Sequence, residues 1–124
     1  MSKLRLAWLI AGAGWVALVV YLSLANIHLP QGAISWGDKL NHFVAYGFLM
    51  TWFGQLTRRP QYRAGIALSL IATGVLMEVL QARLPYRWFE ILDALANGAG
   101  VVAACIVLYL GADKILDWLD YRFR

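Results

Sequence analysis

Residues 7–25 read AWLIAGAGWVALVVYLSLA, a stretch without a charged residue or a proline. About 20 apolar residues are what an α-helix needs to cross the hydrocarbon core of a bilayer. A chain of 124 residues is too short to bury such a run inside a soluble core. The stretch therefore predicts a membrane-spanning helix.

Three further apolar blocks follow, at residues 40–56, 64–82 and 92–111. Hydrophobic residues make up 61% of the chain and charged residues 15%, whereas soluble domains carry about 25% charged residues. Every backbone polar group in lipid must be satisfied within its own segment, so we expect all the blocks to be helices. The sequence predicts a single all-α domain, residues 1–124, folded as a four-helix transmembrane bundle.

Lys3 and Arg5 in front of the first block would also suit a cleaved signal peptide. The apolar stretch of a signal peptide is usually about 7–15 residues long, which is shorter than this block. Residues 23–25 are also a weak cleavage site. We therefore expect a retained helix.

The basic residues lie mostly on one side of the predicted bundle. They precede the first block, separate the second from the third, or follow the fourth: Lys3, Arg5, Arg58, Arg59, Arg63, Lys114, Arg122 and Arg124. Only Lys39, Arg83 and Arg87 lie on the other side. Because basic residues are enriched in cytoplasmic loops, both termini are expected in the cytoplasm. We interpret the net charge of +4 as this topology signal and expect no nucleic-acid partner.

The tail at residues 112–124 has Ile115, Leu116, Leu119 and Phe123 at helical spacing, with charged residues between them. This pattern is typical of an amphipathic helix that lies on the cytoplasmic face of the membrane. The alternative is that the fourth helix simply continues into water.

Polar residues that lipid tolerates poorly gather at the outer ends of the blocks. Little polar chemistry is expected at the inner ends, apart from the basic topology residues and the amphipathic tail. Asp38, His42 and Tyr46 share a helix face, and Glu78 and Gln81 are helical neighbours. The remaining candidates are Lys39, Arg87, Asp93 and Asn97. Because a bare carboxylate inside lipid costs about 2.5–3.5 kcal/mol, we expect Glu78 to pair with Arg87, Lys39 or His42, or to hold a proton.

Three segments carry a resemblance to a known family: residues 38–46 (DKLNHFVAY), 78–81 (EVLQ) and 87–100 (RWFEILDALANGAG). In this order they resemble the motifs of the VanZ-like family of membrane proteins. The resemblance implies a bacterial plasma-membrane location and the polar positions named above. It also implies a link to the cell envelope and to resistance against the glycopeptide antibiotic teicoplanin, but it assigns no reaction and no cofactor.

The first functional hypothesis is a polar pocket that binds an amphiphile in the outer leaflet. The ligand would be a lipid head group, a lipid-linked precursor or a lipoglycopeptide, and the binding residues would be Asp38, Lys39, His42, Tyr46, Glu78, Gln81, Arg87, Asp93 and Asn97.

Two alternatives remain open. In the first, Glu78, His42, Asp93 and Asp38 are catalytic, or bind a divalent metal, in a membrane-embedded enzyme that acts on a lipid. In the second, the polar residues clamp the helices of a non-catalytic scaffold. The lipid-facing surface also leaves a homo-oligomer open.

Overall fold

The computed structural model describes residues 1–25, 36–86 and 90–123. Within these ranges the chain is helical and has no strand. The elements are, in order, α1 (Lys3–Leu24), α2 (Trp36–Gly54), α3 (Pro60–Gln81), α4 (Ile91–Tyr109), a short 3₁₀ helix η1 (Ala112–Lys114) and α5 (Ile115–Arg122). The all-α prediction is confirmed.

Among the described residues, three helices are long and apolar enough to cross a membrane, namely α1, α3 and α4. This supports the prediction of a membrane protein. α2 does not meet the same standard, because Asp38, Lys39 and His42 fall within its first turns. That α2 also crosses the membrane therefore stays a prediction.

The helices begin before the predicted apolar blocks, because their first turns include polar residues. At α1 the side chain of Ser2 accepts a hydrogen bond from the backbone N–H of Arg5 (3.2 Å), which caps the helix. α3 begins at Pro60, which has no N–H to leave unsatisfied at a first helical position. Apolar blocks therefore mark the lipid-facing part of a helix rather than its ends.

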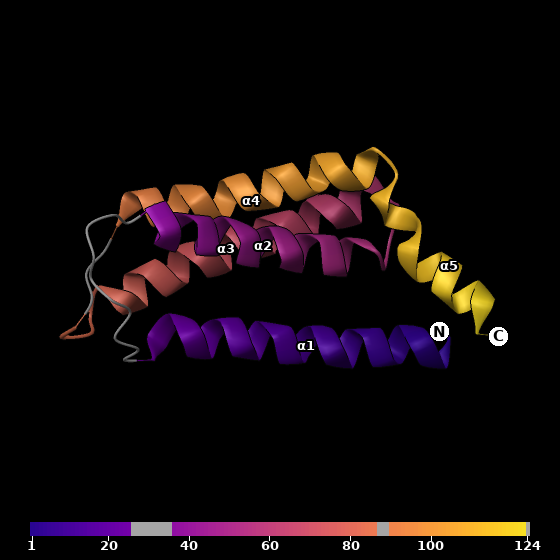
Figure 1. The fold of residues 1–124 in the computed structure, drawn as a ribbon, viewed down its shortest axis with the longest axis horizontal. Coiled ribbons are helices and arrows are strands. Elements are labelled where there is room, and N and C mark those ends of the chain that lie inside the picture. Colours follow the sequence, from indigo (N-terminus) through magenta and orange to yellow (C-terminus); the bar gives the residue numbers. More distant parts are fainter. Residues whose placement is uncertain (26–35, 87–89, 124) are drawn as a thin grey trace.

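Consecutive long helices run antiparallel, and both termini lie at the same end of the molecule (Figure 1). We call this the terminal end. The opposite end, where α2 and α4 begin and α3 ends, is the far end. The arrangement makes α2 and α4 parallel neighbours, with α3 beside them.

The core lies among α2, α3 and α4 and is apolar. Its buried side chains are Tyr46, Leu49, Met50, Leu70, Val101, Ala104 and Leu108. Many outward-facing side chains are also large and apolar, including Ile10, Leu68 and Leu95, each more than 60% exposed. An apolar exterior on this scale suits a molecule whose surroundings are lipid.

α1 is fastened to α2 by aromatic side chains. The rings of Trp8 and Trp52 stack at 3.9 Å, and each indole N–H donates to the other residue's backbone carbonyl, at 2.9 and 3.0 Å. Trp15 meets Phe48 edge-on at 5.3 Å. Each indole N–H is thereby satisfied inside an apolar layer.

α4 does not continue into the tail. Gly111 adopts a left-handed φ of 118°, which suits glycine, and α5 then turns back toward the start of α1 (Figure 1). Leu116 is fully buried, whereas Ile115, Trp118 and Phe123 are exposed. The structure therefore has a separate tail helix, although Leu116 faces the bundle instead of joining the predicted apolar stripe. Its position on a membrane surface remains a prediction.

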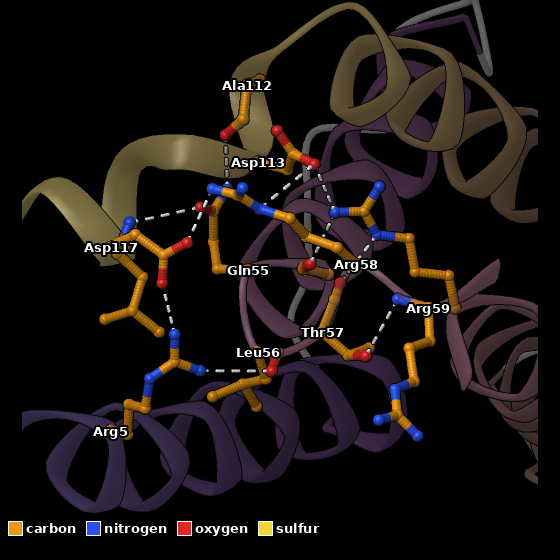
Figure 2. Close-up of polar contacts among 12 residues, drawn as sticks. Arg5, Gln55, Leu56, Thr57, Arg58, Arg59, Ala112, Asp113 and Asp117 are labelled. Carbon is orange, nitrogen blue, oxygen red and sulfur yellow. Dashed lines mark hydrogen bonds and ion pairs between the residues drawn. The ribbon is translucent and has the colours of Figure 1, made fainter. Parts of the chain in front are cut away.

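The terminal end is held by an arginine–aspartate network (Figure 2). Arg5 and Arg58 both pair with Asp117, the latter at 2.6 Å, and Arg63 pairs with Asp113 at 2.8 Å. Gln55 donates to the carbonyl of Ala112 (2.6 Å) and accepts from the N–H of Leu116 (3.3 Å). The network is thus made by the basic topology residues and the tail, and Gln55 is the polar residue that joins them from the end of α2.

Asp113 makes this network sensitive to acid. The hydrogen bond from Arg63 holds the pKa of the Asp113 carboxyl below its usual range. A depressed folded-state pKa adds stability above the unfolded value of about 3.9, and this stability disappears as the pH falls through the lower folded value. We expect Asp113→Asn to lower the thermal unfolding midpoint in detergent at pH 7, and the difference from wild type to shrink below about pH 4. Lys114→Gln, an exposed neighbour, should match wild type throughout; a constant Asp113→Asn difference would contradict the assignment.

Candidate functional site

The backbones of α2 and α4 touch where two glycines cross. A Cβ atom on Gly100 would lie 2.2 Å from the carbonyl oxygen of Phe43, and one on Gly47 would lie 3.2 Å from the carbonyl oxygen of Gly100. Small residues allow this kind of close helix approach in membranes. The contact brings the polar first turns of the two helices together at the far end.

Lys39 on α2 is the central cation of these turns. Its ammonium donates to Oε2 of Glu90 at 2.9 Å and to Oδ1 of Asp93 at 3.1 Å. The Lys39 and Asp93 side chains are only 11% and 8% exposed. This is a largely buried ion pair, in which removal of one partner leaves the other uncompensated.

His42 lies between two carboxylates and an amide. Its Nδ1 is 2.9 Å from Oδ1 of Asn97, within hydrogen-bond distance. Its Nε2 is 3.7 Å from Oδ2 of Asp38 and 3.6 Å from Oδ2 of Asp93. One ring nitrogen and two carboxylate oxygens therefore face a common point, an arrangement that suits a cation.

Glu78 on α3 is fully buried, and neither of its carboxylate oxygens has a hydrogen-bond partner among the described residues. The groups that act on it electrostatically are the side chains of Asp93, His42 and Asp38 and the backbone N–H of Glu90, which does not reach hydrogen-bond geometry. Of the predicted alternatives, a hydrogen-bonded pair with Lys39 or His42 is not found: Lys39 bonds to Glu90 and Asp93, and His42 bonds to Asn97. That Glu78 holds a proton stays a prediction. The predicted partner Arg87 lies outside the described residues.

The other candidates have different surroundings. Gln81 is turned toward α1, where its amide donates to the carbonyl of Ser23 at 2.6 Å. Tyr46 lies deeper, and its buried hydroxyl has no partner in the described part of the chain. Asn97 packs against Gly74, at which a Cβ atom would lie 3.0 Å from Nδ2 of Asn97.

The structure thus joins five of the predicted residues directly and places Glu78 against them; we call the set the far-end cluster. Its members are Asp38, Lys39, His42, Glu78, Glu90, Asp93 and Asn97. Glu90 was not among the sequence candidates, although its position three residues before Asp93 is a signal that it shares a helix face. Four carboxylates face one ammonium and one imidazole, so the cluster favours a cationic ligand.

The fold and the site together define a membrane-type protein that is helical throughout its described ranges, with three helices long and apolar enough to cross a membrane and a buried acidic cluster at one end. The chain matches no protein-family model, no curated protein and no solved structure. Its likeness to the VanZ-like family rests on the three sequence motifs and stays a prediction.

The glycine crossing provides a direct test of how the site is positioned. Gly100→Ala places a methyl group against the backbone of α2, and we expect it to lower the free energy of unfolding in detergent by about 1–3 kcal/mol. Gly98→Ala is the matched control on the same helix, since its Cβ meets nothing within 4 Å. It should leave the stability unchanged or raise it by up to about 1 kcal/mol. Equal effects of the two substitutions would contradict the close crossing.

Proposed function

We propose that this chain is a multi-pass protein of the bacterial plasma membrane, of the VanZ-like type, that binds the polar head of an amphiphile at the far-end cluster. α2 is the fourth span in this proposal, both termini are cytoplasmic, and the far end faces the outer leaflet. The observation that carries the proposal is Glu78, a fully buried carboxylate without a hydrogen-bond partner among the described residues.

The topology is supported by the basic and aromatic residues. Arg5, Arg58 and Arg63 lie at the terminal end, which is the side expected to face the cytoplasm. Exposed aromatic side chains flank the molecule at both ends, as in the aromatic belts of membrane proteins: Trp36 and Tyr86 at the far end, Trp118 and Tyr121 at the terminal end. α2 has 19 residues, as many as α4, and lies parallel to it.

Binding is favoured over a purely structural role by the state of Glu78. A clamp between helices gains its energy from hydrogen bonds, as Gln81 does with the carbonyl of Ser23. Glu78 makes no such bond in the described chain, yet burying a carboxylate is expensive. A group held at such expense is characteristic of a binding or catalytic site rather than of a scaffold.

The excess of negative charge in the far-end cluster restricts which lipid head groups can bind there. Its single ammonium, on Lys39, is already shared between Glu90 and Asp93. A bare phosphate would therefore meet mainly carboxylates, whereas an amine or a head group with a bound cation would be attracted. Among the candidate amphiphiles, amine-bearing lipids and lipoglycopeptides fit best.

A membrane-embedded enzyme is the second candidate, and His42 favours it. Asn97 orients the imidazole through Nδ1, and Nε2 faces Asp38 and Asp93. An imidazole oriented in this way can take a proton from a substrate or a bound water. Turnover of a lipid substrate that stops in His42→Gln would support this candidate.

The experiment compares Glu78→Gln with Gln81→Leu. Each protein is purified in mild detergent, its thermal unfolding midpoint is measured, and the retained lipids are identified by mass spectrometry. We expect Glu78→Gln to keep or raise the midpoint, because it removes an uncompensated buried charge, and to lose the retained amphiphile. Gln81→Leu should lower the midpoint by an amount equivalent to about 0.6 kcal/mol and keep the amphiphile.

The opposite pattern would contradict the proposal. If Glu78→Gln lowered the midpoint and left the retained lipids unchanged, Glu78 would be a structural clamp. The far-end cluster would then belong to a scaffold.

A further inference from the structure

We propose that Asp38, His42 and Asp93 bind a divalent transition-metal ion at the far end, between α2 and α4. This site is additional to the amphiphile-binding function, since it can be filled in protein that holds no lipid. One ligand atom from each of the three residues lies within 4.8 Å of the others.

The distances suit a single ion. Nε2 of His42 is 3.7 Å from Oδ2 of Asp38 and 3.6 Å from Oδ2 of Asp93. Ligands at about 2.0–2.2 Å from a tetrahedral zinc ion are separated from one another by about 3.4 Å. The Asp38 side chain is 40% exposed and has room to move. A shift of a few tenths of an ångström, about the difference between these distances and the tetrahedral spacing, brings the three ligand atoms within reach of one ion.

The surroundings of His42 are those of a metal ligand. A metal ion at Nε2 requires the ring proton on Nδ1, and Oδ1 of Asn97, 2.9 Å from Nδ1, is an acceptor for that proton. Ligating histidines nearly always donate their second ring N–H to an oxygen acceptor. Asn97 is itself 1% exposed, so the imidazole is held by a side chain that is itself packed.

Glu78 supplies a second and independent indication of a cation. It is fully buried, unpartnered in the described chain, and acted on by the same three residues, Asp93, His42 and Asp38. Lys39 offsets only part of the charge of the carboxylates around it. A divalent ion at the three ligands would offset the charge of Glu78 and of the two aspartates.

The donor set selects the class of ion. An imidazole nitrogen suits zinc and similar transition metals, whereas magnesium and calcium prefer sites made only of oxygen. We therefore expect Zn²⁺ and Co²⁺ to bind and Mg²⁺ to bind at least tenfold more weakly.

The test uses full-length protein in detergent, stripped of metal with a chelator and of lipid by extensive washing. Zn²⁺ binding is measured by equilibrium dialysis, and Co²⁺ binding by the visible absorption of the bound ion. We expect one ion per chain in wild type, and a loss of affinity of at least tenfold in Asp38→Asn and in His42→Gln. Asp117→Asn, which removes a carboxylate at the terminal end, should bind as wild type does.

Asp38→Asn keeps the test decisive even if His42→Gln misfolds, because Asp38 is partly exposed and its side chain pairs only with His42 within the described part of the chain. Wild-type affinity in Asp38→Asn, or equal Zn²⁺ binding by wild type and His42→Gln, would overturn the metal site. The amphiphile is measured separately, in the presence of chelator. If wild type retains the amphiphile but binds no metal ion, this inference alone is refuted. If wild type binds the metal ion but retains no amphiphile, the proposed function alone is refuted.

Discussion

The contact between the backbones of α2 and α4 is the constraint on which the far end of the molecule depends. Gly47 and Gly100 bring the two helices closer than any side chain would permit. Only at this separation can Lys39 reach Asp93 and can His42 reach Asn97. The same crossing leaves α3 to cover the pair, with Gly74 against Asn97 and Glu78 facing the acidic turns. Three helices thus form one polar site because two glycines carry no side chain.

The two ends of the bundle differ in how their acidic and basic side chains are balanced. At the terminal end, arginines and aspartates are matched, and Gln55 ties the α2 end to the tail through two hydrogen bonds. At the far end, carboxylates outnumber the cations, and one of them is buried without a hydrogen bond in the described chain. Matched charges stabilise a fold, whereas unmatched buried charges persist where a ligand completes them. This difference in charge balance favours the far end as the functional site.

The sequence predicts the helices well, because long apolar blocks have few other ways to satisfy their backbone in a chain of this length. It also predicts that Asp38, His42, Asp93 and Asn97 converge, since each lies on a helical stripe at the same end. It does not predict the partners. Lys39 donates to Glu90 and Asp93 rather than to Glu78, because the register of α2 against α4 places its ammonium beside them. The sequence likewise places the tail carboxylates Asp113 and Asp117 in an amphipathic pattern. Nothing in the sequence near them indicates that α5 turns back toward Arg5 and Arg58.

The polar start of α2 has a consequence for how the chain is made. In the proposed topology, Asp38, Lys39 and His42 must be lodged near the membrane surface, but their partners on α4 are separated from them in sequence by the whole of α3. A ribosome that adds about 5–20 residues per second delivers α4 a few seconds after α2. Until then the charged first turns of α2 have no partner residues on α4, so α2 by itself inserts poorly into the bilayer. α2 is therefore expected to be the last helix to insert stably into the bilayer, because its insertion depends on contacts with α4, which is synthesised after it.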